Sequence, residues 1–468
     1  MSIIFSYPTS KTAYSWIGNR ILNPSYNPLN DPFVTFGANP LIDNFSGYKY
    51  MPTSLDMSIA RYKESFIKDV NGNPNYNDPI VELADKNWNK TVQPITPDST
   101  KINLIDNQWS NVINTSGFNE KVNVAYVNGI TPAGETYVGG GVNSNDNVIL
   151  INAGFLDYST QDLSLGTWGG WMLMHELGHV YGVFHGVDDE ALNQRPELLK
   201  MSIMWYPQKG NYAEAKIPLT PGMADIDAMQ LKFGESRAQD GNTQYIFGQG
   251  SVDLGHGNVL AGVTSANLKN YVMTLWDSPD AKGGIDTIDA STLSTRVYID
   301  LRAGHFSAIG TDWNQAPDAA SADLNGDGDP DGDTKFNVGI ANLAQIENAK
   351  GGAVDDYLQG NYLNNKLEGN GGNDTLDGSA GNDYLLGGSG NDTYLFKGAA
   401  YGIDTIEDSD GTIIVDGQTL SGGEYKFESI YKNEGTRYQY IKVNGGADLL
   451  VLKQGDANRI IINNCPQG

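Results

Sequence analysis

The sequence predicts an α+β protein in two parts: a mixed-sheet domain with one helix that carries a metal motif, then an all-β domain folded as a parallel β-roll. Three observations lead to this prediction. The run from His175 to His185 reads H-E-x-x-H-x-x-G-x-x-H, a nine-residue repeat runs from Gly351 to Leu395, and alternating strands with Gly-rich turns follow the repeat. The spacing of the histidines predicts a helix in the first part of the chain. The repeat predicts a β-roll in the second part.

The first observation is a zinc-binding pattern on a predicted helix. His175 and His179 are four residues apart, so at about 3.6 residues per turn they project from one face and can share one metal ion. Gly182 tolerates the backbone conformation that ends the helix, which lets His185 return as the third ligand. Glu176 would lie beside the metal as the general base for zinc-bound water. We therefore predict one catalytic Zn²⁺ with an open fourth position.

Surface histidines that happen to lie four residues apart are the alternative interpretation. Five specified positions make this weaker than it would be for a bare H-E-x-x-H. Three of the five histidines of the chain also fall inside these eleven residues. The zinc site is the stronger hypothesis, and we expect its helix to begin near Trp168 to Trp171.

A methionine and a tyrosine follow the motif in the apolar segment Ser202-Ile203-Met204-Trp205-Tyr206. After the zinc motif, this segment resembles the Met-turn of the metzincins. Its Met-x-Tyr pair resembles in particular the serralysin and astacin branches, in which the tyrosine is an additional, displaceable zinc ligand that moves to the oxyanion. The resemblance implies that role for Tyr206 and a structural role for Met204. Core packing of both residues is the alternative.

The second observation is the repeat, whose copies match G-G-x-G-x-D-x-U-x. In a parallel β-roll the glycines make tight turns, the sixth-position carboxylates face calcium and the eighth-position side chains share a core. The predicted calcium ligands are Asp356, Asp374, Asp383 and Asp392. Asn365 replaces the aspartate in the second copy, which weakens that site. A flexible Gly/Asn-rich linker is the alternative, and strict nine-residue phasing disfavours it.

The charge balance excludes some classes of partner. The chain has 30 basic and 56 acidic residues and a formal net charge of −26, which argues against nucleic acid and anionic membranes. Its single cysteine, Cys465, excludes an intrachain disulfide framework. Several structural Ca²⁺ ions are expected instead, and without them the aspartates of the repeat repel one another.

The sequence predicts neither a Sec-type signal peptide nor a membrane span. We expect a secreted, extracellular protein from the zinc motif and the repeat, and such a protein would have to carry another export signal. A roll that stays loose until it meets calcium suits export as an unfolded chain.

Together, the zinc motif, the Met-turn and the repeat resemble the serralysin family of secreted bacterial metalloproteases. Residues 221–234 are similar to the helix that closes the family's catalytic domain, and residues 243–291 to the start of its calcium-binding β domain. The resemblance implies a metzincin-type protease domain that hydrolyses internal peptide bonds, with calcium ligands at Asp286 and Asp289. Its candidate partners are protein substrates, a type I secretion apparatus and a proteinaceous inhibitor, and we expect a monomer.

The chain departs from the family in several places. Gly186 stands where serralysins usually have proline, which leaves substrate preference open. Residues 1–100 match neither the family's propeptide nor its opening helix. The sequence ends Asn-Asn-Cys-Pro-Gln-Gly where the family has an acidic-hydrophobic tail, so we expect either a secretion signal further in or another export route. An acidic insertion within 311–335 has the alternating oxygen donors of an EF-hand-like loop but lacks its final glutamate, so a solvated acidic turn is the alternative. The candidate calcium ligands of this insertion are Asp323, Asn325, Asp327, Asp329 and Asp331.

The expected layout has five segments. They are an N-terminal extension with a candidate pro-segment and the start of the catalytic domain (1–100), the catalytic domain (101–240), a β domain leading into the roll (241–350), the nonapeptide roll (351–395) and a C-terminal β cap with a candidate secretion region (396–468). Within the catalytic domain, residues 121–127 and 148–151 are predicted strands. The neighbourhood of Gly139 to Gly141 is the candidate edge strand for substrate.

Two other functions stay open. One is a calcium-dependent binding or adhesion protein, because such repeats occur on exported proteins of unrelated function. Its binding to a surface or glycan would survive the loss of Glu176. A toxin with the same zinc site would cut one target and leave general substrates such as casein intact.

Overall fold

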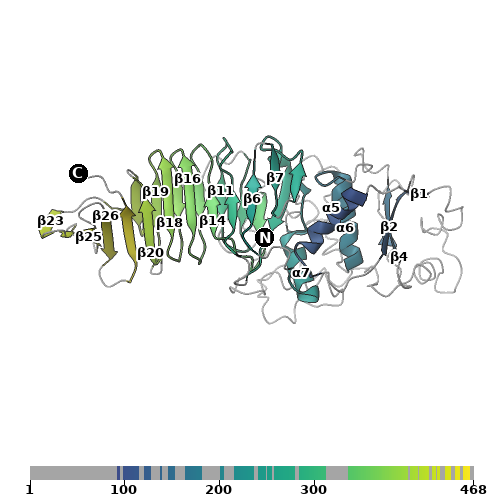
Figure 1. Cartoon of the computed structure of the whole chain (residues 1–468), viewed down its shortest axis with the longest axis horizontal. Coiled ribbons are helices and arrows are strands. Elements are labelled where there is room, and N and C mark those ends of the chain that lie inside the picture. The colour runs from purple at the N-terminus through teal and green to yellow at the C-terminus, as the bar shows by residue number, and fades with distance from the viewer. Residues whose placement is uncertain are drawn as a thin grey trace, which may run out of the picture. The chain divides into compact units, whose positions relative to one another are not determined.

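A computed structural model gives the fold of the chain (Figure 1). The residues that it describes are 92–94, 99–114, 121–127, 138–139, 146–152, 164–181, 201–204, 216–236, 241–248, 250–255, 258–279, 284–311, 336–398, 401–408, 411–420, 424–427, 430–432, 438–443, 448–453 and 457–463. They form two compact units. The first contains the described residues up to Ser236 together with 270–274, and the second contains the rest.

The first unit has a mixed sheet and helices α5, α6 and α7 in its described part. The helices span Ser99–Ser110, Trp168–Tyr181 and Met223–Phe233, respectively. The sheet has the order β1-β2-β4-β3, with the bounds Val92–Pro94, Lys121–Val127, Asp146–Asn152 and Val138–Gly139. β2 and β4 run parallel, and β1 and β3 run antiparallel to their neighbours. The strands predicted at 121–127 and 148–151 are confirmed.

Helix α6 begins where the sequence predicts, at Trp168. Thr167 caps it, because its Oγ1 accepts a hydrogen bond from Gly170 N at 3.0 Å. Gly170 must be glycine, since a Cβ there would lie 2.1 Å from the carbonyl oxygen of Ser164. All residues from 171 to 178 are buried. α6 is therefore a core helix rather than an amphipathic surface helix.

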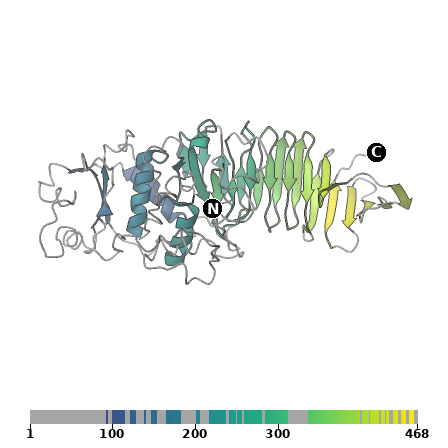
Figure 2. The ribbon, with the colours of Figure 1, turned by 180° about the vertical axis from the view of Figure 1, so that it is seen from behind.

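Helix α5 lies beside α6 in both views of the ribbon (Figures 1 and 2). Trp109 of α5 is wholly buried, and its Nε1 donates to the carbonyl oxygen of Met174 at 3.1 Å. At the end of α6, the Tyr181 hydroxyl donates to Asp106 Oδ1 at 2.6 Å. These two bonds hold α6 against α5 at its middle and at its last residue.

Helix α7 is buried at every position from 223 to 230. Its side chains Met223, Ile226 and Met229 are each at most 1% exposed. α7 follows a short strand, β5 (Ile217–Pro218), which pairs in parallel with residues 271–272 at the start of β9 (Tyr271–Leu275).

One buried carboxylate ties segment 201–204 to α7. Asp225 Oδ2 accepts hydrogen bonds from Ile203 N at 2.8 Å and Gly222 N at 2.9 Å. Asp225 Oδ1 accepts a third from Ser202 Oγ at 2.6 Å. Burial raises the pKa of Asp225 to about 7, although the three hydrogen bonds act in the opposite direction. The segment with the predicted Met-turn is therefore positioned by α7.

The second unit contains a parallel β-roll of two sheets, seen as ladders of strands in Figures 1 and 2. The parallel strands of the first sheet are β6 (Gln244–Phe247), β10 (Thr287–Asp289), β14 (Asn348–Lys350), β16 (Lys366–Gly371), β18 (Tyr384–Ser389), β20 (Ile403–Glu407) and β27 (Arg459–Asn463). Those of the second are β11 (Tyr298–Asp300), β15 (Tyr357–Gln359), β17 (Thr375–Asp377), β19 (Thr393–Phe396) and β21 (Thr412–Val415). Through the repeats, successive strands alternate between the sheets, so one coil consists of two nonapeptides.

Eighth-position side chains of the repeat fill the space between the two sheets, as the sequence predicts. Leu358 lies opposite Leu376 in one sheet, and Leu367 lies opposite Leu385 in the other. All four are 0% exposed, and Tyr394 of the last copy is 1% exposed. Each such burial stabilises the roll by about 1.5–3 kcal/mol.

Shorter strands flank the roll within the second unit. They are β7 (Ser251–Asp253), β8 (Val259–Ala261), β12 (Phe306–Ser307), β13 (Val338–Ile340), β22 (Gln418–Thr419), β23 (Glu424–Phe427), β24 (Ile430–Lys432), β25 (Tyr438–Val443) and β26 (Asp448–Lys453), with the one-turn helix η4 (Leu268–Asn270). The strands predicted at 412–415, 438–443 and 449–452 are confirmed as β21, β25 and part of β26. Within the described ranges, no helix combines the length and apolarity that crossing a membrane requires.

Removing a stacked leucine should weaken the roll. We expect Leu385→Ala to lower the free energy of unfolding by about 2–5 kcal/mol, because it leaves a cavity between the sheets. Leu386→Ala is the matched control, since the neighbouring side chain of β18 is only partly buried. Urea unfolding in calcium measures both, and equal losses would contradict the stacked core.

Removing the carboxylate of α7 should loosen segment 201–204. Asp225→Ala leaves the Ile203 and Gly222 N–H groups buried without an acceptor, and we expect the first unit to lose about 3 kcal/mol or more of unfolding free energy. Asp225→Asn is the control and should lose less, because its amide oxygen accepts from both N–H groups and its amide nitrogen can donate to Ser202 Oγ.

The same residue should leave a pH signature. The pKa of Asp225 is raised in the folded protein, so its contribution to stability is full below about pH 4 and is lost as the pH rises through about 7. Tryptophan fluorescence during denaturation, compared between wild type and Asp225→Asn, should show this loss in the wild type only. A loss of equal size in the Asn variant would assign it to other groups.

Candidate zinc and calcium sites

His175 is a buried imidazole with a defined orientation. It is 0% exposed, and its Nδ1 lies 2.8 Å from the carbonyl oxygen of Ile203. A carbonyl oxygen only accepts, so Nδ1 donates, and the lone pair of the neutral ring lies on Nε2. The ring also packs edge-on against Trp171, with centroids 5.8 Å apart. A ring that the backbone holds by Nδ1 in this way has its Nε2 available for a metal ion.

Glu176, the next residue of α6, carries a buried carboxylate. It is 0% exposed, and neither of its oxygens has a hydrogen-bond partner among the residues that the structure describes. Burial raises the pKa of Glu176 well above its usual value. A carboxylate in this setting needs a cation or a proton nearby.

Met204 packs directly against the backbone of α6. A Cβ at Gly178 would lie 3.0 Å from Met204 Sδ and 3.0 Å from Trp109 Cζ2. Met204 itself is 0% exposed, and its N–H donates to Ser202 Oγ at 3.1 Å. The residue predicted to be structural therefore lies beneath the helix that carries the zinc motif.

The remaining zinc-site predictions are only partly covered. His179 lies in α6, one helical turn after His175, but its side chain is outside the described part of the chain. Gly182, His185 and Tyr206 also lie outside the described residues. The described part fits a zinc site: an imidazole with its lone pair on Nε2, a second histidine one turn along, and an adjacent carboxylate without a donor.

The sixth-position aspartates of the roll form two rows, in which each backbone N–H donates to the next carboxylate. In one row, Asp356 N donates to Asp374 Oδ1 at 2.7 Å, and Asp374 N donates to Asp392 Oδ1 at 2.8 Å. In the other, Asn365 N donates to Asp383 Oδ1 at 2.8 Å, and Asp383 N donates to Asp404 Oδ1 at 2.9 Å. The rows bring the predicted ligands together at the turns of successive coils.

The second carboxylate oxygens in these rows lack donors. Oδ2 of Asp374, Asp383 and Asp404 has no hydrogen-bond partner in the described part of the chain, and these residues are at most 2% exposed. Burial, together with the repulsion of neighbouring carboxylates, raises the pKa of Asp374 and of Asp383 to about 8 and that of Asp404 to about 7. Such oxygens are suited to hold a divalent cation.

Asp404 is a site residue that sequence reasoning missed. It follows Asp383 by 21 residues, whereas the residues earlier in the rows follow one another by 18. The nine-residue phase is therefore broken before it. The remaining signal is local, since Gly402-Ile403-Asp404-Thr405-Ile406 keeps the glycine and the alternating apolar residues of a repeat.

A cluster of carboxylates lies at the start of the roll. Asp286 Oδ1 accepts from Thr243 N at 2.6 Å, and Asp286 N donates to Glu347 Oε2 at 2.8 Å. Asp277 Oδ2 accepts from the Tyr245 hydroxyl at 2.8 Å. Burial, with the mutual repulsion of these groups, raises the pKa of Asp277 to about 7 and that of Asp286 to about 8. Only Asp286 was predicted, because isolated acidic residues carry no repeat signal.

Asp289 has a different set of contacts. Its Oδ1 accepts from Ser291 N at 2.9 Å, and its Oδ2 lies 3.6 Å from Lys350 Nζ. The structure therefore places this predicted calcium ligand in an ion pair. The candidate ligands from Asp323 to Asp331, and Cys465, lie outside the described residues. In the described part, no three or more His, Cys, Asp or Glu side chains converge as a metal site, so the calcium positions would also need backbone carbonyl ligands.

Comparison with known protein families identifies the repeat. The RTX calcium-binding nonapeptide repeat, in four copies, matches residues 359–394. This agrees with the repeat that the sequence predicts over 351–395, apart from its first copy.

Curated relatives are similar over a larger region. Serralysin of Proteus mirabilis is 30% identical over 210 residues, which cover 42% of this chain and 36% of that protein. Metalloprotease AprA of Pseudomonas entomophila (strain L48) is 30% identical over 240 residues, 48% of this chain and 42% of that protein. Serralysin of Photorhabdus luminescens is 29% identical over 234 residues, 45% of this chain and 40% of that protein. The matched region spans less than half the length of each relative, and over it the chain is serralysin-like, with RTX calcium-binding repeats in its C-terminal half.

Proposed function

We propose that this chain is a secreted, zinc-dependent endopeptidase with a calcium-stabilised roll. The observation that carries the proposal is the wholly buried carboxylate of Glu176, which follows His175 on α6 and has no hydrogen-bond donor among the described residues. The similarity to proteins named serralysin and metalloprotease supports the same class of activity.

His175, His179 and His185 are the proposed zinc ligands, and Tyr206 is the proposed additional one. When bound, Zn²⁺ supplies Lewis-acid chemistry, which acidifies water and polarises a carbonyl group. The chain's own contribution at His175 is orientation, because Ile203 holds the ring by Nδ1 and Asp225 in turn holds Ile203 N. Tyr206 would stabilise the oxyanion that develops on the scissile carbonyl.

Glu176 is the proposed general acid and base. Its carboxylate accepts a proton from the attacking water and then donates this proton to the leaving amine. Because water itself attacks the carbonyl carbon, no covalent acyl-enzyme forms. Burial raises the pKa of Glu176, which increases its affinity for the proton that it must hold between the two steps. The absence of competing donors among the described residues leaves both oxygens available to water.

Strand β3 is the proposed substrate-binding edge. It is the last strand in the order β1-β2-β4-β3 and pairs antiparallel with β4. An extended peptide can add to such an edge through main-chain hydrogen bonds, which suits an enzyme that cuts internal bonds of varied sequence. The Gly-rich neighbourhood predicted for this role includes Gly139 at the end of β3.

Calcium is proposed to neutralise the buried carboxylates of the second unit. Asp374, Asp383, Asp404 and the Asp277–Asp286–Glu347 cluster would use backbone carbonyls as further ligands. Asp356, Asp392, Asp289 and the loop from Asp323 to Asp331 stay predicted ligands. Because calcium binds the folded roll, its free energy adds to folding, which suits export through a type I apparatus as an unfolded chain. We also propose that the chain is a monomer, that its substrate is a protein and that a proteinaceous inhibitor binds it.

Replacing the general base tests the enzyme. We expect Glu176→Gln to reduce casein hydrolysis by the full chain, in zinc and calcium, by about 10²–10⁴-fold, because proton transfer is lost while the shape is kept. Zinc content, measured by atomic absorption, should stay near one per chain in this variant and fall in His175→Ala.

Glu368→Gln is the matched control, since this partly exposed roll residue pairs with Lys366 on the surface. It should keep full activity. If the folded, zinc-loaded wild type hydrolyses casein no faster than Glu176→Gln, general proteolysis is refuted. Calcium-dependent binding to a surface that survives in Glu176→Gln would then favour the binding-protein alternative.

Calcium removal tests the roll. We expect Asp374→Asn to be more stable than the wild type in EGTA, because a buried carboxylate without a donor is neutralised, and less stable in millimolar calcium, because a ligand is lost. Asp355→Asn removes the same charge from an exposed residue that also repels Asp374, and it should change the stability much less in both conditions. Thermal unfolding followed by circular dichroism measures the stability in EGTA and in calcium. If Asp374→Asn is more stable than the wild type in both conditions, or less stable in both, a calcium role for Asp374 is contradicted.

A further inference from the structure

The first two copies of the repeat differ from the later three at the fourth position. The later copies have Gly372, Gly381 and Gly390, with φ of 117°, 133° and 132°. A Cβ at these glycines would lie between 1.8 and 2.3 Å from a backbone atom of the coil before. The first two copies have Val354 and Leu363 there, and neither has a positive φ. Their turns are therefore of another kind.

The second of these copies carries Asn365 in place of the sixth-position aspartate. Asn365 is 2% exposed, and its Oδ1 accepts a hydrogen bond from Asn361 N at 2.8 Å. Its Nδ2 donates to the carbonyl oxygen of Glu347 at 2.8 Å and to Asn361 Oδ1 at 3.0 Å. Both amide hydrogens of Asn365 are therefore engaged in hydrogen bonds.

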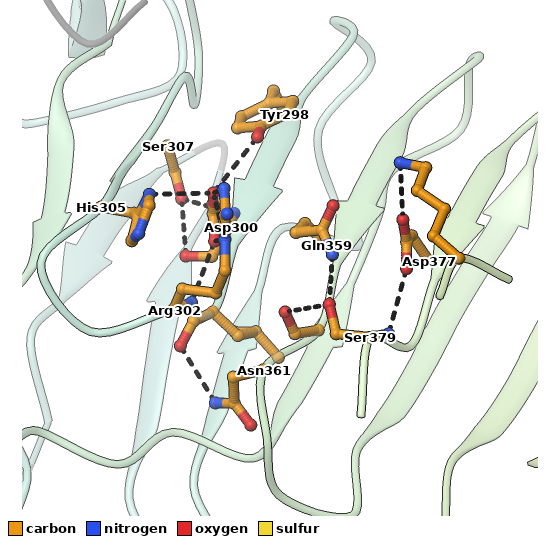
Figure 3. A network of polar contacts seen from close by, with 12 residues as sticks. Tyr298, Asp300, Arg302, His305, Ser307, Gln359, Asn361, Asp377 and Ser379 are labelled. Atoms are coloured by element: carbon orange, nitrogen blue, oxygen red, sulfur yellow. Dashed lines mark hydrogen bonds and ion pairs between the residues drawn. The ribbon is translucent and has the colours of Figure 1, made fainter. Parts of the chain in front are cut away.

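Asn361 completes the arrangement. It is 5% exposed, and its Nδ2 donates to the carbonyl oxygens of Leu301 at 3.0 Å and Ile346 at 2.9 Å. Figure 3 draws one hydrogen bond of Asn361. Its Oδ1 also accepts from Leu363 N at 2.8 Å. The two side chains thus donate four hydrogen bonds, three of them to backbone carbonyl oxygens that precede the nonapeptide repeats.

The same coil satisfies its aspartate as well. Asp356 Oδ1 accepts from Val297 N at 2.7 Å, and Asp356 Oδ2 accepts from Gly352 N at 2.5 Å. Oδ2 of Asp374, Asp383 and Asp404 has no such donor in the described structure. Backbone carbonyls and a carboxylate oxygen that face one another repel unless a cation lies between them, whereas amide hydrogens are attracted to carbonyls without any ion.

We propose that the amides of Asn361 and Asn365 take the place of a calcium ion, so that the first coil of the nonapeptide repeats, residues 351–368, stays folded without calcium and templates the coils after it. The proposal rests on the calcium dependence proposed above for the later coils. In a structure of stacked repeats, each coil gains its stability from its neighbours. A coil that is already formed removes the cost of starting the calcium-dependent coils, which then assemble onto β15 and β16 when calcium binds.

Hydrogen exchange on the full chain tests the template. In EGTA, we expect the amides of β14, β15 and β16 to be protected at least about tenfold more than those of β18, β19 and β20, and calcium to remove most of this difference. Equal loss of protection in both groups in EGTA would overturn the proposal.

Variants test the asparagines themselves. We expect Asn365→Asp to reduce the EGTA protection of β14 to β16 by at least about tenfold, because a carboxylate replaces the donor to Glu347. Asn364→Asp is the matched control: this neighbour is exposed, its Oδ1 accepts from Asn382 N, and an aspartate keeps that oxygen. The control should match the wild type. Unchanged protection in Asn365→Asp would overturn the proposal.

A triple variant tests the exchange of amides for calcium. Asn361→Gly, Leu363→Gly and Asn365→Asp together write G-G-x-G-x-D into the second copy. Calorimetric titration should give one more calcium per chain than in the wild type, and the first coil should now need calcium for protection. The wild-type stoichiometry in the folded variant would overturn the proposal, and if the triple variant does not fold in calcium, Asn365→Asp decides. A wild type that binds no calcium at all would instead refute the calcium role of the roll.

Discussion

Buried carboxylate oxygens without hydrogen-bond donors are the constraint on which both units depend. Glu176 in the first unit and Asp374, Asp383 and Asp404 in the second are nearly or wholly buried, and burial raises the pKa of each. A charge in such a place is stable only beside a cation or after taking up a proton. In the first unit, this need for a cation or a proton suits catalysis at a metal ion. In the second unit, it would make folding depend on calcium.

The fold could be predicted where residue type repeats with a simple period. The eighth-position residues from Leu358 to Tyr394 recur every nine residues, so their burial between two sheets followed from the sequence alone. Helix α6 and strands β2 and β4 were predictable from local pattern and caps. The pairing of β20 with β27 was not, because it joins segments separated by a meander with no shared repeat.

The candidate site was predictable in the parts whose chemistry is local in sequence. His175 and Glu176 are adjacent, and their helix places both without knowledge of the rest of the chain. Asp225, Asp277 and Glu347 make their contacts with distant segments of the chain, and no spacing in the sequence marks them. Asn365 was recognised as a lapse of the repeat, but its effect could not be predicted, because its amide partners, Glu347 and Asn361, are set by how the coils stack.

Asn365 and Asp383, the next residue in its row, differ in one side-chain atom, a nitrogen in Asn365 and an oxygen in Asp383. Both backbone N–H groups donate to the next carboxylate of the row, and both side chains are buried. The amide nitrogen of Asn365 has two acceptors, whereas Oδ2 of Asp383 has no donor among the described residues. With an aspartate in place of Asn365, no amide hydrogen would reach the carbonyl oxygen of Glu347, and this coil would also need a cation to form. Placing the amide at the start of the row gives the later, ion-dependent coils an edge on which to assemble, so calcium would extend the roll rather than initiate it.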